Sequence, residues 1–401
     1  MKSVLKIKPV VYGIIAFAIV ARLTSSTSPA IAVIQKAFPQ ANHTAVESLA
    51  TIGDAAAVLS ALVVGQLLAR WSFKQLGLIS LTLLAGGGLL PLIWHQSVTQ
   101  LLIWGFLAGL GTGGITTILP SLQSFSFQGE QLAIILGKVV ALENGSSMVL
   151  VFIGGLLASR NWLYNYYIFF LTFLAIIVVW FTVPNQRPQS PSNSAPTMQQ
   201  TPMSVMRPRQ ILMVIFYIFV ASIIVFLEAT LYNKNALFIN NYHLGSPALT
   251  GQIMMLDGLA AIVVGLTIKY LRRWLKKYLL VFSFTLDALG GLLLLKWHSV
   301  LSIGLATFCM GAGSAIVLMT VPYLLSLLAS PKRYPLIMGC FSAITSLGFS
   351  SSAVIFNNLV PLFTKNLLGG TYLLVLLIAV VMIILLTGLN LAQLSRDFLS
   401  N

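Results

Sequence analysis

The pentapeptide RWSFK at residues 70–74 returns 203 positions later in the chain as RWLKK at residues 273–277. Other identical pairs keep the same ungapped spacing: Asp54 with Asp257, Ser80 with Ser283, Gly87-Gly88-Leu89-Leu90 with Gly290-Gly291-Leu292-Leu293, and Trp94-His95 with Trp297-His298. The chain contains only seven tryptophans and four histidines, so two Trp matches and one His match in one register are not expected by chance. The sequence therefore predicts a tandem duplication, which constrains the architecture before any single helix is assigned.

The composition is that of a membrane protein. Of the 401 residues, 58% are hydrophobic and 8% are charged, whereas soluble domains have roughly 45–50% apolar and about 25% charged residues. The apolar residues form blocks of about 20, the length of helix that crosses a hydrocarbon layer roughly 30 Å thick. We therefore expect an all-α membrane protein of twelve transmembrane helices, arranged as two six-helix bundles. The expected spans are 10–34, 45–69, 75–94, 100–122, 132–157, 163–183, 209–233, 248–270, 278–296, 300–327, 335–360 and 369–393.

One segment fits neither a membrane span nor a packed core. Residues 184–208 are rich in Pro, Ser, Gln and Asn, a composition typical of a flexible linker. The predicted domains are thus an N-terminal six-helix bundle at 1–183, a cytoplasmic linker at 184–208 and a C-terminal six-helix bundle at 209–401.

The basic residues gather in short loops on one side of the membrane. With the N-terminus placed in the cytoplasm, fifteen cations fall in inner segments: Lys2, Lys6, Lys8, Arg70, Lys74, Arg187, Arg207, Arg209, Arg272, Arg273, Lys276, Lys277, Lys332, Arg333 and Arg396. Five fall in outer loops: Lys36, Arg160, Lys234, Lys296 and Lys365. This bias predicts a multi-pass protein of the cell membrane with both termini in the cytoplasm. The net charge of +15 then reports topology rather than a nucleic-acid partner.

Charged side chains inside the spans are candidates for function, because each costs roughly 2.5–3.5 kcal/mol near the bilayer centre. Arg22 lies near the middle of the first span and is followed by a run of hydroxyl side chains. A guanidinium stays charged and offers a planar set of donors to a carboxylate. We therefore predict a substrate site that contains Arg22, Thr24, Ser25 and Ser28.

Glu143 and Asn144 lie in the fifth span. A carboxylate isolated in a dry helix bundle exchanges a proton near neutral pH, whereas one paired with a cation stays charged. Glu143 is therefore a candidate proton carrier, with Asn144 beside it as a substrate ligand; alternatively, an ion pair between Arg22 and Glu143 braces span one against span five. Neither charge has a mate in the other repeat, because Val225 and Ser346 occupy the equivalent positions.

No group of residues suited to bond-breaking chemistry stands out, so an enzyme is not expected. The histidines fall in outer loops or at span ends, without the spacing of metal ligands; they are His43, His95, His243 and His298. The sequence has no phosphate-binding loop of the G-x-x-x-x-G-K-S type. We predict no catalytic residues, no metal and no cofactor.

Twelve spans, two similar halves in the same orientation and a long cytoplasmic central loop together resemble the major facilitator superfamily over the whole chain. The family's signature loop, Gly-x-Leu-x-Asp-Arg-x-Gly-Arg-Lys, is similar to GQLLARWSFK at 65–74, where Gly65, Leu67, Arg70 and Lys74 match and Ala69 and Ser72 depart. The resemblance implies a role in the cytoplasmic gate for Gly65, Arg70 and Lys74, and for Arg273 and Lys277 in the second copy. Simple determinants of topology are the alternative. Because Ala69 replaces the family's aspartate, the latch is expected to be weaker or built differently.

The remaining intramembrane carboxylates each allow two interpretations. Asp54 and Asp257, which match in the repeat, are candidates for a proton carrier or for hydrogen bonds that cap helices and hold the outer gate. Glu228 is a further candidate proton site, although Lys234, expected in the loop that follows, offers it a neutralising partner. Asp287 is expected to be structural.

Two branches of the superfamily show a weaker resemblance. Residues 21–31 are similar to the Asn-Leu-Arg-Pro-Ala-Ile stretch of cyanate and nitroimidazole porters, with a different spacing to the proline. In span five, Gly154-Gly155 matches part of the antiporter signature of multidrug efflux proteins, but Leu150 and Val151 stand where that signature has Gly-Pro.

The predicted function is secondary active transport, in which two bundles open a midplane cavity alternately to either side. Intramembrane carboxylates favour coupling to protons, and the mostly apolar spans favour export of small amphipathic organic compounds or drugs. The alternatives are an uptake porter for a small organic anion bound by Arg22, and a non-transporting scaffold or receptor on the same fold. The expected partners are a small-molecule substrate, protons and the lipid bilayer, and the protein is expected to be a monomer.

Overall fold

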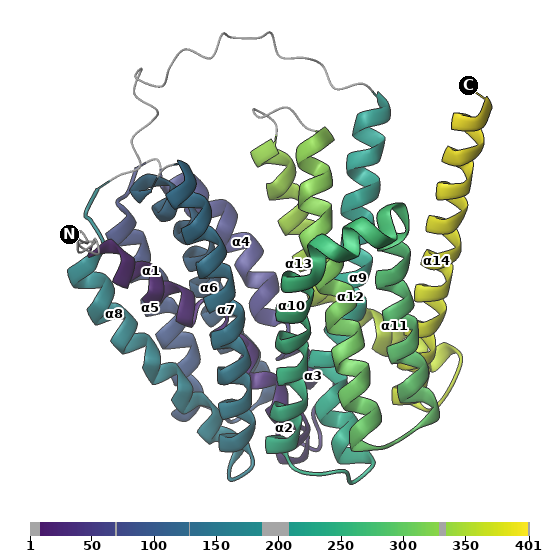
Figure 1. Ribbon diagram of the computed structural model, residues 1–401. Coiled ribbons are helices and arrows are strands. Elements are labelled where there is room, and N and C mark those ends of the chain that lie inside the picture. Colours follow the sequence, from purple (N-terminus) through teal and green to yellow (C-terminus); the bar gives the residue numbers. More distant parts are fainter. Residues whose placement is uncertain (1–8, 69, 128, 187–207, 329–333, 400–401) are drawn as a thin grey trace, which may run out of the picture. The chain divides into compact units, whose positions relative to one another are not determined.

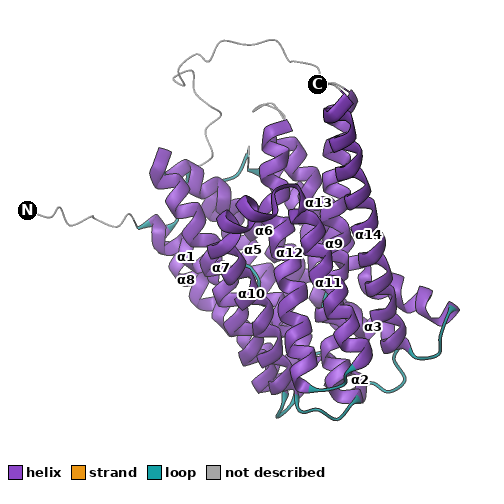
Figure 2. Cartoon of the chain, turned by 45° about the vertical axis from the view of Figure 1, so that its right-hand side comes forward, coloured by secondary structure: helices purple, strands orange, loops and turns teal. Residues whose placement is uncertain are grey.

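The computed structural model describes residues 9–68, 70–127, 129–186, 208–328 and 334–399. Within those ranges all regular secondary structure is helical (Figure 2), which confirms the predicted all-α class for this part of the chain. The chain divides into two compact units, residues 1–203 and 204–401, and each unit has a hydrophobic core of its own.

The helices follow one another in both units with short connections (Figure 1). In the first unit they are α1 (Val10–Val20), η1 (Leu23–Ala30), α2 (Ile31–Ala37), α3 (His43–Ser48), α4 (Ile52–Leu67), α5 (Phe73–Leu89), η2 (Leu90–Leu92), α6 (Val98–Ser126), α7 (Gly129–Ala158), η3 (Trp162–Phe170) and α8 (Leu171–Thr182). In the second unit they are α9 (Pro208–Asn241), α10 (Pro247–Leu275), η4 (Lys276–Tyr278), α11 (Leu279–Lys296), α12 (Val300–Leu328), α13 (Tyr334–Leu359), η5 (Val360–Leu362) and α14 (Leu367–Leu399). The segments named η are 3₁₀ helices.

Ten candidate membrane spans are present in the described residues. One of them, Pro247–Lys296, contains both α10 and α11, and the apolar helix α4 is shorter than the ten, at 16 residues. This pattern is that of a multi-pass membrane protein. The division into twelve spans and two six-helix bundles stays a prediction.

Several of the predicted spans are not single α-helices. The first, expected at 10–34, is α1, η1 and α2 in sequence, and the sixth, expected at 163–183, is η3 followed by α8. The second, expected at 45–69, is α3 and α4 separated by a turn. In that turn the N–H groups of Leu49 and Ala50 donate to the carbonyl oxygens three residues before them, which is the 3₁₀ pattern. Hydropathy registers an apolar stretch but not the change in hydrogen-bond spacing inside it.

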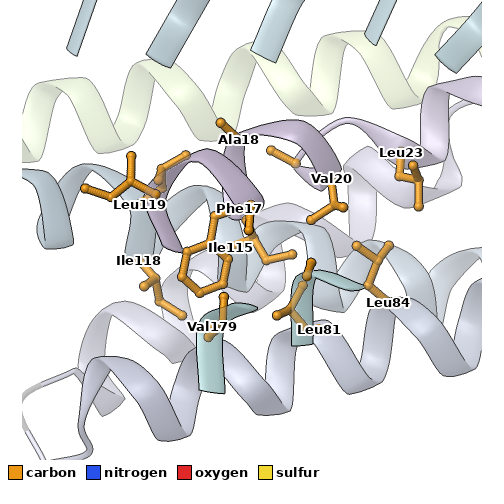
Figure 3. Packing of buried hydrophobic residues seen from close by; sticks show 14 of the residues in the cluster. Phe17, Ala18, Val20, Leu23, Leu81, Leu84, Ile115, Ile118, Leu119 and Val179 are labelled. Atoms are coloured by element: carbon orange, nitrogen blue, oxygen red, sulfur yellow. The ribbon is translucent and has the colours of Figure 1, made fainter. Parts of the chain in front are cut away.

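The core of the first unit forms around Phe17 of α1, which is fully buried. Leu81 of α5, Ile115 of α6 and Val179 of α8 are buried in the same cluster (Figure 3). Gly77 of α5 makes this packing possible, since a Cβ there would lie 2.6 Å from Phe17 Cζ. Lipid supplies no hydrophobic drive between helices, so close packing of this kind holds the bundle together.

The duplication is visible as equivalent contacts between helices. A Cβ at Gly111 of α6 would lie 2.4 Å from the Ser80 carbonyl oxygen, and a Cβ at Gly313 of α12 would lie 2.7 Å from the Ser283 carbonyl oxygen. Ser80 and Ser283 are 203 positions apart, yet Gly111 and Gly313 are 202 apart. Helices α6 and α12 are therefore equivalent with one residue fewer in the second copy.

The missing residue belongs to the loop before these two helices. Ser97 accepts a hydrogen bond of 3.3 Å from the N–H three residues on and so caps α6, and Ser299 caps α12 in the same way at 3.2 Å. These two serines are 202 positions apart, whereas His95 and His298 just before them are 203 apart. The capping serine is therefore shifted by the same one position as the helix that it caps, and the helix contacts are equivalent in both copies although the loop is shorter in the second.

Candidate functional site

The first unit has a helix break at the predicted substrate residue. Helix α1 ends at Val20, Arg22 has a non-helical backbone (φ −117°, ψ 26°), and the chain continues as η1. Pro29 lies inside η1 and has no backbone N–H to donate. Irregular backbone within a membrane is tolerated where protein or water covers the freed polar groups, so the polar backbone groups at this break need such cover.

The predicted hydroxyl ligands around this break have different surroundings. Thr24 and Ser25 are half-buried. Ser28 is fully buried, and its Oγ has no hydrogen-bond partner among the described residues. Ser26, by contrast, donates to the Leu23 carbonyl oxygen at 2.7 Å. Ser28 is therefore the hydroxyl in η1 whose bonding capacity is most clearly unused.

The Arg22 side chain is exposed, and its charge acts on two carboxylates, those of Asp54 and Glu143. Both carboxylate residues are half-buried. The interaction is shared between α4 and α7 rather than confined to a single ion pair with Glu143. An exposed guanidinium in this position has donors to offer to an incoming anion.

The matched pair Asp54 and Asp257 occupies two different local environments. Asp54 lies in the first turn of α4, because the helix begins only at Ile52 and not at residue 45. A carboxylate there is stabilised by the positive end of the helix dipole. Asp257 lies in the interior of α10 and accepts a hydrogen bond from the Tyr232 hydroxyl at 2.7 Å. The sequence match between the two does not extend to their interactions.

Helix α7 approaches η1 at Gly154. A Cβ at this glycine would lie 2.5 Å from the Ser26 carbonyl oxygen and 2.7 Å from Asn165 Oδ1. Asn165 in η3 is fully buried, and in the described part of the chain neither polar atom of its carboxamide has a hydrogen-bond partner. Sequence reasoning did not single out Asn165, since only the fold brings it to η1. Glu143 and Asn144, the predicted residues on α7, are half-buried.

In the second unit, Lys234 lies inside a helix, and its predicted place in an outer loop is wrong. Helix α9 continues from Pro208 to Asn241, through the polar run at 232–235. Lys234 is 1% exposed, and its Nζ donates to Asn357 Oδ1 of α13 at 2.6 Å. A polar run after an apolar one is typical of a span end, but here the helix buries that run against its neighbours.

The side chains on either side of Lys234 extend this buried polar group. Asn233 Nδ2 lies 3.4 Å from Ser352 Oγ, and Asn235 Nδ2 donates to Thr307 Oγ1 at 3.1 Å. Both asparagine Oδ1 atoms are buried without a hydrogen-bond partner in the described residues. We call Asn233, Lys234, Asn235 and Asn357 the Lys234 cluster. It combines a buried cation with unused amide oxygens.

Two carboxylates of the second unit interact with each other. Asp287 of α11 is fully buried, and neither of its oxygens has a hydrogen-bond partner among the residues described. Its charge is opposed by that of Glu228, which is half-buried in α9. Gly313 leaves space for it, since a Cβ there would lie 3.1 Å from Asp287 Oδ1. Two neighbouring carboxylates resist being ionised together, so Asp287 joins Glu228 as a candidate to hold a proton.

The predicted gate loop is tied to the segment that leaves α8. Ser72 caps α5 in a reciprocal capping box with Gln75, and its Oγ also donates to Asn185 Oδ1 at 2.6 Å. Ser72 replaces a glycine of the family signature, and this bond is what the replacement adds. Lys74 Nζ lies 5.2 Å from the ring centroid of Trp180. Position 69, where the signature has its aspartate, lies outside the described residues.

The other predicted gate residues lie at helix ends. Gly65 is exposed in the last turns of α4, with nothing within 4 Å of an added Cβ, and Arg70 is exposed just after that helix. Arg273 is exposed in the last turn of α10, and Lys277 Nζ lies 5.3 Å from the Tyr278 ring centroid. Cations at a helix C-terminus are favoured by the helix dipole, so these positions fit either a gate or a topology signal.

No three His, Cys, Asp or Glu side chains that could hold a metal ion come together within the described ranges. The polar groups of the first unit are instead suited to hydrogen bonding with a ligand and to electrostatic interaction with it. Arg22, Ser28 and Asn165 offer donors and acceptors, and Asp54 and Glu143 offer carboxylates that share one cation.

Residues 13–353 match the family described as the Major Facilitator Superfamily. The match covers most of the chain, and the chain belongs to this superfamily. A comparison with curated proteins finds no match.

Solved structures of transporters share the fold. A mutant of the nucleoside transporter NupG superposes with a TM-score of 0.74 at 15% identity, covering 95% of this chain and 99% of that one. A mutant of the peptide transporter POT gives 0.73 at 13% identity, covering 96% and 95%. A bacterial homolog to the human lysosomal transporter Spinster, inward-facing and unoccupied, gives 0.65 at 13% identity, covering 94% of each chain. The protein is thus a multi-pass transporter by family and fold, and not an enzyme.

Proposed function

We propose that the protein is a proton-coupled secondary active transporter that takes up a small organic anion by alternating access. The observation that carries this proposal is the exposed Arg22 guanidinium at the break between α1 and η1. Arg22 binds the carboxylate of the substrate, and Thr24, Ser25, Ser28 and Asn144 supply further hydrogen bonds. The buried and unused carboxamide of Asn165 supports a polar substrate over an apolar one.

The shared charge of Arg22 provides a route to proton coupling. Arg22 interacts electrostatically with the carboxylates of Asp54 and Glu143. An anion bound at Arg22 neutralises that charge, so one of the two carboxylates then binds a proton more readily. Linkage is reciprocal, so a bound proton also favours binding of the anion. Substrate and proton therefore move together down the proton gradient.

The second unit contributes its own proton and substrate groups in this proposal. The Lys234 cluster provides a cation and amide oxygens, and Glu228, Asp257 and Asp287 are the carboxylates available for proton exchange. NupG and POT, which are a nucleoside and a peptide transporter, have polar substrates, in keeping with polar groups in both units. We place the protein in the cell membrane as a monomer, with both termini cytoplasmic.

Export of small amphipathic compounds or drugs is the second candidate. It is favoured by large apolar side chains that stand exposed on α4 and α10: Leu59, Leu62 and Val63, and Leu259, Ile262, Val263 and Leu266. Leu59 and Val63 are equivalent to Ile262 and Leu266 in the repeat. Such faces would suit apolar compounds better than anions.

Arg22→Lys separates the two candidates. Small mono- and dicarboxylates, nucleosides and dipeptides are first screened for thermal stabilisation of the purified protein, and a stabilising compound is then followed in proteoliposomes. If Arg22 binds an anion bidentately, the lysine variant raises KM at least about tenfold, because the planar pair of donors is lost. Arg160→Lys, at an exposed loop position, serves as the matched control and keeps the original KM. Unchanged KM in both variants would reject the anion site.

Proton coupling is tested separately in the same vesicles. A proton gradient directed into the vesicles should drive accumulation of the substrate. At least one of five single variants should abolish this accumulation while leaving counterflow intact; the variants are Asp54→Asn, Glu143→Gln, Glu228→Gln, Asp257→Asn and Asp287→Asn. Flux that ignores the gradient would refute the coupling. No flux for any compound that binds would refute transport itself and favour a scaffold or receptor.

A further inference from the structure

The second unit contains a cavity of about 710 Å³ that the transport proposal does not use. It lies where α9 begins and α10 ends, and α11, α12 and α14 complete its walls. In Figure 1, α11 and α14 run side by side in this unit, in agreement with their contacts. Among the described residues that line the cavity, four are cations and none is acidic; the cations are Arg209, Arg272, Lys276 and Lys277. The cavity is therefore suited to an anion.

Arg272 is held in place by α12 and still has a donor to spare. Its Nη2 donates to the Met319 carbonyl oxygen at 2.7 Å, and its Cζ lies 4.7 Å from the Tyr323 ring centroid. The Nε–H is buried without a hydrogen-bond partner in the described part of the chain. A buried donor without an acceptor is unfavourable, so this fixed guanidinium with an unused Nε–H is suited to a ligand that supplies an acceptor.

Thr320 supplies a second unused group on the same wall. It is 6% exposed and lines the cavity one turn from Tyr323, and its Oγ1 is also buried without a partner among the described residues. Two polar atoms, Arg272 Nε on α10 and Thr320 Oγ1 on α12, thus belong to residues that line one cavity, and neither has a hydrogen-bond partner among the described residues. A guanidinium N–H and a hydroxyl together match the oxygens of a phosphate group.

The helix dipole explains only part of this arrangement. Arg272 and Arg273 both lie in the last turn of α10, where any cation is favourable. Arg273 is exposed and does not line the cavity, whereas Arg272 is fixed against Met319 and Tyr323. If Arg272 only set the membrane topology or interacted with the helix dipole, its charge would be enough and its fixed position would not be needed.

Much of the remaining lining is apolar and includes exposed side chains. Leu212 of α9 is 67% exposed and Leu389 of α14 is 47% exposed, and both line the cavity together with Phe216. A free phosphate ion would gain nothing from these side chains. An acyl chain would cover them, and basic pockets between membrane helices bind anionic lipid headgroups in this way.

We propose that this cavity binds an anionic phospholipid. The phosphate accepts hydrogen bonds from Arg272 Nε and Thr320 Oγ1, Arg209, Lys276 and Lys277 surround the headgroup, and an acyl chain lies along Leu212 and Leu389. The site is distinct from Arg22 and from the Lys234 cluster, so its occupancy is separable from substrate binding.

The test measures lipid binding to the purified full chain. Phosphatidylglycerol, phosphatidylcholine and inorganic phosphate are titrated separately, and bound lipid is counted by native mass spectrometry alongside the thermal unfolding midpoint. The wild-type chain should bind phosphatidylglycerol at least about tenfold more tightly than phosphatidylcholine, and Arg272→Gln should remove most of that preference, since charge-assisted hydrogen bonds are lost. The matched control, Arg273→Gln, removes an equal charge one position away and should change the affinity less than about twofold.

The remaining outcomes each decide the proposal. If Arg272→Gln does not fold, Thr320→Val removes a hydroxyl without removing charge and should still weaken phosphatidylglycerol binding severalfold. An equal loss of phosphatidylglycerol affinity in Arg272→Gln and Arg273→Gln would show that binding is unspecific charge attraction, and the proposed site would be wrong. Saturation by inorganic phosphate at the affinity of the lipid would overturn the lipid as occupant, because the acyl chain would then contribute nothing.

Discussion

Lys234 shows that the place of a charged side chain depends on its partners more than on its local sequence. The polar run around it is typical of the end of a span, yet Asn233, Lys234 and Asn235 are buried, and each has a partner on α12 or α13. The candidate groups Arg22, Glu143 and Asp54 are visible in sequence because charges are rare in apolar spans. Asn165 and the interaction of Asp287 with Glu228 are not, because neutral or distant residues acquire their roles only through tertiary contacts.

We predict that Asn357→Leu lowers the unfolding midpoint of the purified protein. The variant removes the oxygen that accepts from the buried Lys234 ammonium, and loss of a hydrogen bond to a charged group costs about 1.5–3 kcal/mol. The measurement is thermal unfolding in detergent, followed by intrinsic fluorescence. The double variant Lys234→Met with Asn357→Leu should be less destabilised than Asn357→Leu alone, since the ammonium that lost this acceptor is then absent too. If the decreases in unfolding midpoint of the two single variants simply added up in the double variant, the predicted coupling between Lys234 and Asn357 would be contradicted.

At the scale of elements, the helices that sequence predicts well are those whose hydrophobic pattern runs unbroken. The expected spans at 100–122 and 248–270 lie within the single helices α6 and α10. The first, second and sixth spans were predicted as continuous and contain 3₁₀ segments or turns. Those departures depend on close approaches such as Gly154 to Ser26, which no local pattern reports.

Gly154→Ala should disturb the contact between α7 and η1. The new methyl group would lie 2.5 Å from the Ser26 carbonyl oxygen, and overpacking of this kind typically costs about 1–3 kcal/mol. We expect a lower unfolding midpoint and reduced transport. Gly145→Ala on the same helix has nothing within 4 Å of its added carbon and serves as the control; it should be neutral or slightly stabilising, because alanine favours helix over glycine. Equal effects of the two changes would contradict the packing argument.

Ser72→Ala is expected to loosen the start of α5 and its tie to the segment after α8. The change removes the N-cap oxygen and the bond to Asn185 together, and loss of a cap costs about 1 kcal/mol. Asn185→Ala removes only the second interaction and should cost less. Unfolding midpoints of both variants, together with the rate of proteolysis near residue 185, test the order. If Asn185→Ala lowered the unfolding midpoint more than Ser72→Ala does, the N-cap of α5 would not be important for stability.

At the scale of the molecule, composition, the internal repeat and the signature loop were enough to indicate a membrane transporter of this superfamily, and the family match confirms it. Substrate and direction of transport do not follow from the same features. In the proposed mechanism they depend on a few polar groups such as Ser28 and Asn165, whose unpartnered hydrogen-bonding atoms are found only from the packing.

The predicted orientation can be checked with single cysteines in a chain whose own Cys309 and Cys340 are replaced by serine. Gln96→Cys lies in an expected outer loop and Arg273→Cys at an expected inner helix end, and both positions are exposed. A membrane-impermeant maleimide on intact cells should label Gln96→Cys and spare Arg273→Cys, because the positive-inside bias places the latter in the cytoplasm. Disrupted membranes should allow both to react. The reverse pattern on intact cells would invert the topology.

The single residue missing from the loop before α12 decides how the two copies can be exchanged or aligned. A chimera that replaces α12 by α6 has to be joined at the capping serines, Ser97 and Ser299, because those positions are structurally equivalent. Joining at the histidines instead would turn every following side chain by about 100° around the helix axis. Gly111 would then point away from Ser283, and a helix with an unchanged composition would present the wrong face to its neighbours.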